Sequence, residues 1–270
     1  MSIPVYFQAH RGSVDEAPEN TLAAFRHAWQ FPGAIPETDV RTTADGVLIC
    51  LHDATLARTT NADERAKDVD VASIPLAQIR QWDAGVRFDP TYAGAQVPTL
   101  DELLTMLMAA PNRRLYLEPK AATLPDLEAI ITHHSCLDRL IFVHHSPAFL
   151  QEIRLRFGGV PTMTWLGGSP TTIQDKFETL AETNFVGITQ LQLHLPTIAT
   201  EPHIVYAFDD DYLRSVQERV RIADVTLQLC PSAVDDVSLR HLVDLGVHWF
   251  VTDAPEKFSQ CLSRAEDNKG

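Results

Sequence analysis

Short apolar segments alternate with amphipathic segments along the whole chain, and this alternation restricts the possible folds more than any other feature. The apolar segments have the length and composition of buried strands, and the segments between them have helical periodicity. Nine strands are predicted, at 4–9, 35–40, 47–51, 114–118, 139–143, 161–165, 184–188, 225–229 and 247–251. Helices are predicted at 20–30, 99–109, 125–133, 147–157, 171–182, 210–220, 236–245 and 255–264. Such a strand–helix alternation is typical of an α/β fold with a parallel sheet.

The second and third strands are too close together to run parallel. Seven residues separate Asp39 from Val47 and include the turn signal Asp45-Gly46, whereas a parallel crossover needs about a dozen residues or more. Strand 47–51 is therefore expected to return antiparallel in a β-hairpin. Eight strands remain, which is the number in a (β/α)8 TIM barrel. A turn centred between residues 44 and 45 would place position 37 opposite position 52.

The composition fits one soluble barrel domain over residues 1–270. Apolar residues are 45% of the chain and charged residues 21%, so a sizeable core can be buried. The net charge of −14 argues against nucleic acid or an anionic membrane as the main partner, because both need clustered Lys and Arg. Neither a secretory leader nor a bilayer-spanning apolar run is recognisable, so a cytoplasmic protein without stable membrane insertion is expected.

Three carboxylates fall where a barrel carries its active site, at the C-terminal ends of strands. Period-2 alternation places Glu37 and Asp39 on one strand face, and Glu118 ends the strand after the hairpin. Packed together without a cation, they would repel one another and raise their pKa values. Oxygen-only ligands suit one hard divalent cation, Mg²⁺ or Ca²⁺, better than zinc.

Cationic and titratable side chains are expected at the same end of the barrel. His10 and Arg11 follow the first strand, His52 follows the hairpin, and Lys120 follows Glu118. Two histidines suit phosphoryl transfer, one as base and one as acid. Arg11 can grip phosphate bidentately, and Lys120 offers a point charge.

Each of these side chains also has a structural interpretation. A single histidine at a strand end is more often structural than catalytic, two alternating acids can form a solvated face, and Glu118 with Lys120 can be a surface ion pair. Their predicted convergence at one end of one barrel favours the functional interpretation.

Several short blocks of the chain resemble the glycerophosphodiester phosphodiesterase family of the PLC-like phosphodiesterase superfamily. Their order and spacing hold over about residues 8–120, and GVHWFVTDAPEKF at 246–258 is similar to the family's closing strand and helix. The blocks are AHRG (9–12), PENT (18–21), ETDV (37–40), ADG (44–46), LHD (51–53), RTT (58–60), VPTLDE (97–102) and LEPK (117–120).

The resemblance implies a distorted TIM barrel that hydrolyses glycerophosphodiesters to glycerol 3-phosphate and an alcohol with one divalent cation. It implies a small helical insertion at about residues 54–112. By position, the acid/base pair would be His10 and His52, the metal ligands Glu37, Asp39 and Glu118, and the phosphate contacts Arg11 and Lys120. PENT would start a helix with Asn20 as its N-cap, and Asp53 would either orient His52 or serve only the turn.

The chain departs from the family pattern in the second half. Family members usually carry a tryptophan-containing strand where this chain has VTLQLC (225–230), so the leaving-group preference is open. His144 and His145 stand where a serine and an aromatic residue are usual, with a helix-start role favoured over a pocket role. Trp165 ends another strand and would wall the substrate pocket, a core position being the alternative.

Two other functions stay open. The same centre would serve a lysophospholipid, an inositol phosphodiester or a sugar phosphodiester, and a substrate panel separates these cases. A catalytically silent phosphoester-binding protein would bind such a ligand without turnover. The sequence also does not choose between direct attack by water and prior attack by the glycerol hydroxyl.

Overall fold

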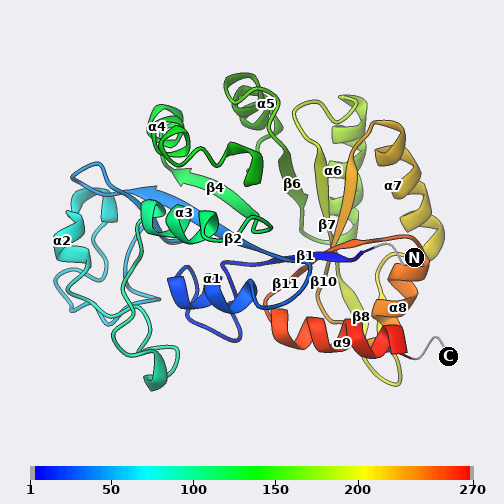
Figure 1. The fold of residues 1–270 in the computed structure, drawn as a ribbon. Helices are drawn as coiled ribbons and strands as arrows, with labels where there is room; N and C mark the ends of the chain where they lie inside the picture. The colour runs from blue at the N-terminus through cyan, green and yellow to red at the C-terminus, as the bar shows by residue number, and fades with distance from the viewer. Residues whose placement is uncertain (1–3, 268–270) are drawn as a thin grey trace. The chain divides into compact units, whose positions relative to one another are not determined.

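The computed structural model describes residues 4–267, and its fold class is the predicted (β/α)8 TIM barrel (Figure 1). The described chain divides into two compact units, one formed by residues 4–8 with 142–267 and the other by residues 9–141. The strands are β1 (Tyr6–Ala9), β2 (Ala34–Thr42), β3 (Leu48–Cys50), β4 (Leu115–Ala121), β5 (Leu140–Val143), β6 (Thr162–Leu166), β7 (Gln190–Leu195), β8 (Thr197–Ala199), β9 (Val205–Tyr206), β10 (Thr226–Pro231) and β11 (Trp249–Thr252).

The helices between these strands follow the predicted amphipathic segments. Short 3₁₀ helices are η1 (Val71–Ser73), η2 (Pro90–Tyr92) and η3 (Leu137–Arg139). The α-helices are α1 (Leu22–Ala28), α2 (Leu76–Ile79), α3 (Leu100–Met108), α4 (Leu124–His134), α5 (Pro147–Arg156), α6 (Pro170–Glu182), α7 (Asp210–Ile222), α8 (Asp236–Asp244) and α9 (Pro255–Asp267). Within the described residues, no helix is both long and apolar enough to cross a membrane.

In the unit of residues 4–8 and 142–267, neighbouring strands lie side by side and run parallel. β6 pairs with β5 and β7, and β10 pairs with β7 and β11, all parallel. Phe7, Phe250 and Phe258 are fully or almost fully buried and pack ring against ring. Helices α8 and α9 lie side by side (Figure 1). The core of this unit is thus built from inward strand residues and aromatic helix contacts.

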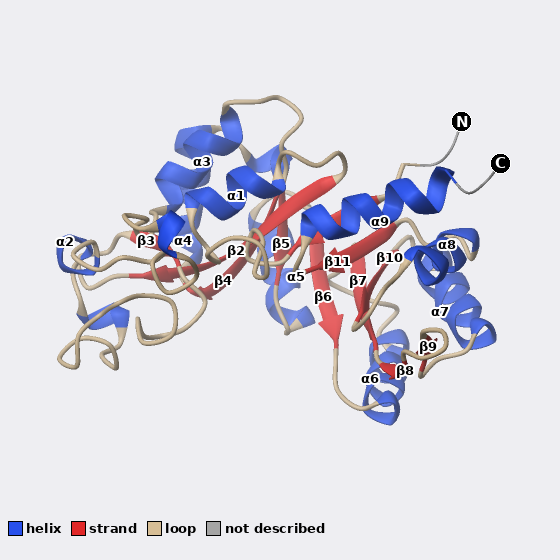
Figure 2. Cartoon of the chain, turned by 90° about the horizontal axis from the view of Figure 1, so that it is seen from below, coloured by secondary structure: helices blue, strands red, loops and turns tan. Residues whose placement is uncertain are grey.

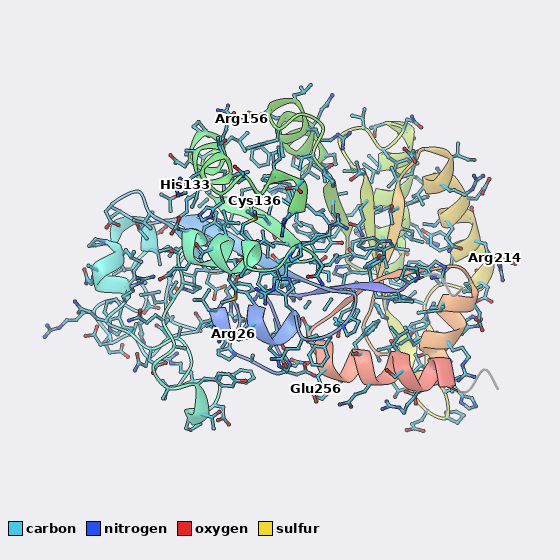
Figure 3. The ribbon with its side chains drawn as sticks, in the orientation of Figure 1. Arg26, His133, Cys136, Arg156, Arg214 and Glu256 are labelled. Atoms are coloured by element: carbon cyan, nitrogen blue, oxygen red, sulfur yellow. The ribbon has the colours of Figure 1, made fainter. Side chains whose placement is uncertain are left out.

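The unit of residues 9–141 is organised around β2. This strand pairs parallel with β4 and antiparallel with β3, which confirms the predicted hairpin. Helix α4 shows the amphipathic pattern clearly: Leu127 and Ile131 are buried, His133 is exposed, and the thiol of Cys136 is buried just after the helix (Figure 3).

The segment between β3 and α3 is mostly loop, with the short helices η1, α2 and η2 (Figure 2). A small hydrophobic cluster holds it, including Leu56, Val71, Ile74 and Ile79 packed with Ile49 of β3. This segment occupies most of the predicted insertion at 54–112. The description of residues 1–270 as a single domain stays a prediction.

The hairpin register differs from the prediction by one residue. Val40 pairs with Cys50 and Thr42 with Leu48, so the turn is centred on Asp45 and position 52 does not stand opposite position 37. The loop has three residues, 44–46, closed by the bond from the Thr43 amide to the Val47 carbonyl oxygen (3.0 Å). Gly46 has φ +79°, as expected where a type I turn ends in a left-handed residue.

Two further predictions of local structure are wrong. Residues 184–188 do not form a strand: Asn184, Phe185 and Gly187 all have positive φ and make the turn after α6, and the strand is β7. Phe185 is buried against Phe177, which explains the apolar character of this segment. The N-cap of α1 is Thr21, whose hydroxyl accepts a bond from the Ala24 amide, and not Asn20.

Candidate active site

Three buried carboxylates converge at the ends of β2 and β4. Oxygen atoms of Glu37, Asp39 and Glu118 lie within 4.8 Å of one another. Asp39 stands beside Glu118 in the parallel register, and Glu37 lies two residues before Asp39 on the same face. All three residues are at most 7% exposed. The structure therefore brings together the three positions predicted as metal ligands.

The electrostatics of this carboxylate cluster call for a cation. Burial, followed by repulsion from Asp39 and Glu118, raises the pKa of Glu37 well above its usual range. Burial also raises the pKa of Glu118, although the Lys120 ammonium opposes that shift. One carboxylate oxygen of Glu37, Oε1, is buried without a hydrogen-bond partner. Hard divalent cations are bound by carboxylate oxygen atoms, and a buried carboxylate needs a positive partner, so the residues fit Mg²⁺ or Ca²⁺.

Lys120 and Arg11 bring positive charge to the carboxylate cluster. The Lys120 ammonium lies 2.8 Å from Oε1 of Glu118 and 3.5 Å from Oδ1 of Asp39. The Arg11 guanidinium Nε lies 3.6 Å from Oδ2 of Asp39. Both cations were predicted as phosphate contacts, and that role stays a prediction. Their side chains are 21% and 16% exposed, so each is partly accessible.

A tight backbone turn after β1 positions Arg11. Its amide donates a 2.9 Å bond to Oε2 of Glu37. Arg11 has φ +48° and Gly12 φ +88°, and a Cβ on Gly12 would lie 2.8 Å from the Ala24 Cβ, so only glycine fits there. His10 precedes Arg11 in this turn and is half-buried. Its role as acid or base stays a prediction.

His52 is held at the end of the hairpin by its backbone and by its ring. Arg41 donates two bonds, of 2.8 and 2.7 Å, to the His52 carbonyl oxygen. His52 Nδ1 lies 2.7 Å from Oδ1 of Asp53. The Arg58 guanidinium and this histidine bond lower the pKa of Asp53 to about 2, so its carboxylate is ionised and only accepts hydrogen bonds. The proton between them is therefore on Nδ1, and Nε2 is the ring nitrogen that Asp53 does not contact.

His52 also lies within electrostatic reach of the carboxylate cluster, where, together with Lys120, it opposes the rise that burial causes in the pKa of Glu118. Bonds or electrostatic contacts thus link Arg11, Glu37, Asp39, His52, Glu118 and Lys120, and His10 precedes Arg11 in the chain. Trp165 belongs to the other compact unit, on β6, where its ring faces that of His145 edge-on at 6.2 Å. Its place in a substrate pocket stays a prediction. His144 has the favoured helix-start role: its Nδ1 accepts the Ser146 amide.

Asn20 is a site residue that the sequence-based prediction assigned to the wrong task. It is 2% exposed, and its side-chain amide donates a 2.9 Å bond to Oδ2 of Asp39. Its oxygen accepts bonds from the Thr38 hydroxyl and the Asp39 amide. The φ of +54° turns the side chain toward β2 and away from the helix that follows. Arg41 was also missed, although the alternation that relates Glu37 to Asp39 extends to it.

Replacing Asn20 by alanine should remove three hydrogen bonds to buried groups of β2, those of the Asp39 carboxylate, the Asp39 amide and the Thr38 hydroxyl. We expect the free energy of unfolding to fall about 1–3 kcal/mol more than in Asn184→Ala, measured by urea denaturation. Asn184 also has positive φ, +52°, but is exposed, so this control carries the backbone strain alone. Equal losses in the two variants would show that the Asn20 side-chain bonds contribute nothing.

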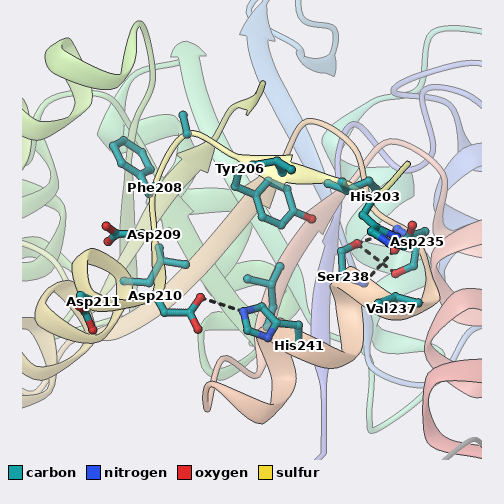
Figure 4. Close-up of a pocket in the computed structure, with 15 residues that line it drawn as sticks. His203, Tyr206, Phe208, Asp209, Asp210, Asp211, Asp235, Val237, Ser238 and His241 are labelled. Atoms are coloured by element: carbon teal, nitrogen blue, oxygen red, sulfur yellow. Dashed lines mark hydrogen bonds and ion pairs between the residues drawn. The ribbon is translucent and has the colours of Figure 1, made fainter. Parts of the chain in front are cut away.

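A cavity of about 660 Å³ lies in the unit of residues 142–267, between the starts of α7 and α8 and the segment 203–208 (Figure 4). Three of its four aspartates are engaged in helix caps or an ion pair. Asp209 and Asp235 cap the two helices, and Asp210 pairs with His241 at 2.8 Å. None of the predicted site residues lines it. It offers no converging set of catalytic groups.

Comparison with known proteins gives a consistent match. The model of the Glycerophosphoryl diester phosphodiesterase family matches residues 10–257. A Glycerophosphodiester phosphodiesterase of Bacillus subtilis (strain 168) is 31% identical over 276 residues, covering 93% of this chain and 84% of the relative.

A shorter alignment and a solved structure agree with that match. A Glycerophosphodiester phosphodiesterase of Caldanaerobacter subterraneus subsp. tengcongensis is 40% identical over 99 residues, which are 37% of this chain and 39% of the relative. This alignment therefore spans less than half of either protein. The crystal structure of glycerophosphodiester phosphodiesterase from Agrobacterium tumefaciens str. C58 has a TM-score of 0.75 at 26% identity, covering 95% of this chain and 99% of that one.

Proposed function

Because the chain belongs to the glycerophosphoryl diester phosphodiesterase family, a family of phosphoric diester hydrolases, we propose that it hydrolyses glycerophosphodiesters. The substrates would be small molecules such as glycerophosphocholine or glycerophosphoethanolamine, and the products sn-glycerol 3-phosphate and an alcohol. The observation that supports this most is the buried cluster of Glu37, Asp39 and Glu118 with its unpartnered oxygen. Such a cluster is costly to fold unless a cation joins it.

The carboxylate cluster would hold one divalent cation, Mg²⁺ or Ca²⁺, through Glu37, Asp39 and Glu118. When bound, the cation would act as a Lewis acid and stabilise negative charge on the phosphoryl oxygens. Asn20 keeps Asp39 oriented through its amide bond, and the Arg11 amide keeps Glu37 oriented. Two of the three proposed ligands would thus be held in place before the cation binds.

The remaining residues have roles that follow from their donors and charges. Arg11 would bind phosphate oxygens through guanidinium N–H groups, with Lys120 as a second positive charge. His52 would exchange a proton at Nε2, since Nδ1 is bound to Asp53. His10 would be the second member of the acid/base pair. One histidine would take the proton of the attacking hydroxyl group or water, and the other would protonate the departing alkoxide.

The substrate proposal is tested by product release from a panel. We expect glycerol 3-phosphate from glycerophosphocholine and glycerophosphoethanolamine, measured with a coupled dehydrogenase assay in excess Mg²⁺ or Ca²⁺. The panel includes a lysophospholipid, an inositol phosphodiester and a sugar phosphodiester. Faster turnover of one of these would reassign the substrate while keeping the centre. Binding of glycerophosphocholine without any turnover would instead identify a silent phosphoester-binding protein.

A further inference from the structure

An arginine outside the predicted set bridges two parts of the candidate active site. Arg58 follows the hairpin, and its Nε donates a 2.7 Å bond to Oδ2 of Asp53. Its two terminal nitrogens donate to the two carboxylate oxygens of Glu19, in the loop before α1. Arg58 and Glu19 belong to separate segments and are 39 residues apart in the sequence. One guanidinium therefore uses three donors to tie two carboxylates together.

Each of these carboxylates continues to a residue with a predicted chemical role. On one side, Asp53 Oδ1 accepts the His52 Nδ1 bond at 2.7 Å. On the other side, Glu19 Oε1 accepts a 3.1 Å bond from Arg11 Nη1. Arg58 is thus the central member of a series of hydrogen-bonded side chains, in the order His52–Asp53–Arg58–Glu19–Arg11. The general acid or base stands at one end, and the phosphate-binding guanidinium stands at the other.

Burial and charge favour a fixed geometry for this series of hydrogen-bonded side chains. The Glu19 side chain is 9% exposed, and burial alone would raise its pKa, but Arg58 and Arg11 together lower it. The two carboxylates that flank Arg58 also raise the pKa of its guanidinium. A planar guanidinium holds two carboxylates in set directions, whereas an ammonium attracts them without orienting them. Losing Arg58 would free Asp53 and Glu19 to move.

We propose that Arg58 is a positioning residue that fixes His52 through Asp53 and Arg11 through Glu19. The proposal rests on the proposed function for its kinetic consequences, but its structural consequence can be measured without substrate. The Asp53 arm selects the His52 tautomer with the proton on Nδ1. The Glu19 arm sets the direction of the Arg11 guanidinium toward phosphate.

The kinetic test separates the two arms. Asp53→Asn should lower kcat with little change in KM, because it disturbs the proton-exchanging ring. Glu19→Gln should raise KM, because it disturbs the phosphate-binding guanidinium. Arg58→Ala should do both, with kcat about 10–100-fold lower, and its effect should not add to those of the single-arm variants. Arg58→Lys should restore only part of the loss.

Chemical rescue adds a readout that a merely structural role would not move. Arg58 lines a cavity of about 170 Å³ and its side chain is 46% exposed, so alanine would leave an accessible space. Millimolar guanidinium chloride should therefore recover part of kcat in Arg58→Ala and none in Asp53→Asn. Arg219→Ala is the matched control, since Arg219 also binds a carboxylate, that of Glu178, through two nitrogens. We expect it to keep wild-type kinetics.

The structural test uses imidazole nitrogen shifts in nuclear magnetic resonance spectra, with the His52 signals assigned from their loss in His52→Gln. The neutral ring should be the Nδ1–H tautomer in the wild type and a mixture in Arg58→Ala. An unchanged tautomer, or unchanged kcat and KM in Arg58→Ala, would overturn the positioning role. If the wild type hydrolyses no phosphodiester, the proposed function fails, while the tautomer measurement still decides the role of Arg58.

Discussion

Replacing His52 by glutamine is expected to lower kcat about 10²–10⁴-fold, the usual contribution of a positioned acid or base. Glutamine keeps a polar side chain but cannot exchange a proton at neutral pH. Steady-state release of glycerol 3-phosphate from glycerophosphocholine measures the effect, and His10→Gln is expected to behave similarly. His241→Gln is the matched control, because His241 also pairs with an aspartate but is half-exposed in the other compact unit.

The leaving group separates the acid from the base. Loss of the general acid should matter much less for a p-nitrophenyl phosphodiester, because p-nitrophenolate departs without protonation. Loss of the base should be equally harmful for both substrates. One of the two histidine variants should therefore keep most of its activity on the p-nitrophenyl ester. Full activity of either variant on glycerophosphocholine would remove that histidine from the acid/base pair.

Replacing Glu37 by glutamine is expected to weaken binding of Mg²⁺ or Ca²⁺ more than about 100-fold, since even the partners of metal ligands contribute 10–100-fold. Activity at a cation concentration that saturates the wild type should fall by a similar factor. Calorimetric titration of the metal-free protein measures the affinity. Wild-type cation affinity in Glu37→Gln would exclude Glu37 as a ligand.

The same variant should have the opposite effect on the stability of the metal-free protein. The pKa of Glu37 is raised on folding, mainly by burial and then by its acidic neighbours. The folded state therefore binds this proton more tightly, so stability falls as the pH rises from the unfolded value of about 4.5 toward the folded pKa, and stays lower above it. Glutamine escapes this cost. Above neutral pH, metal-free Glu37→Gln should melt at a higher temperature than the wild type, and the difference should shrink in acid.

A matched control has the opposite sign. The pKa of exposed Glu178 is lowered, chiefly by its hydrogen bond to Arg219. Glu178→Gln should therefore give no increase in melting temperature above neutral pH.

Saturating cation should reverse the order of the melting temperatures of the wild type and Glu37→Gln, because a ligand that binds only the folded state stabilises it. A Glu37→Gln protein less stable than the wild type without metal would contradict the repulsion argument.

The barrel and its family were predictable because their signals are local. Eight of the nine predicted strands overlap observed strands, and the antiparallel return followed from the short link between Asp39 and Val47. The strand prediction for residues 184–188 was wrong because Phe185 is buried in the turn that follows α6. An apolar run does not distinguish a buried turn from a strand. The small β8–β9 pair was missed for the converse reason: Ile198 and Val205 are exposed, so no buried pattern marks it.

The carboxylate cluster was predictable because strand alternation and barrel topology fix it. The charges of Arg11 and Lys120 beside it were predictable for the same reason. The supporting contacts of Asn20 and Arg58 were not, because they join distant segments. Asn20 serves Asp39 only because the backbone at Asn20 is left-handed, and periodicity does not report such a conformation. The bonds of Arg58 to Glu19 depend on how the loop before α1 meets the segment after the hairpin. The blocks PENT and RTT marked both residues without revealing their tasks.

The three-residue turn at 44–46 also sets a rule for how this chain can vary in evolution. The side chain of Ala44 is exposed, so the turn tolerates other residues there, provided position 46 keeps its left-handed backbone. Asp45 is also exposed, but its carboxylate accepts bonds from the Thr43 hydroxyl (2.6 Å) and the Leu76 amide (3.0 Å) and so joins the turn to the start of α2. The length of the turn is a different matter. Adding or deleting one residue would reverse which face of the sheet each side chain of β3 occupies, and His52 would be displaced with them. Descendants of this sequence should therefore vary freely at position 44, keep an acceptor side chain at position 45, and almost never gain or lose a residue in the turn.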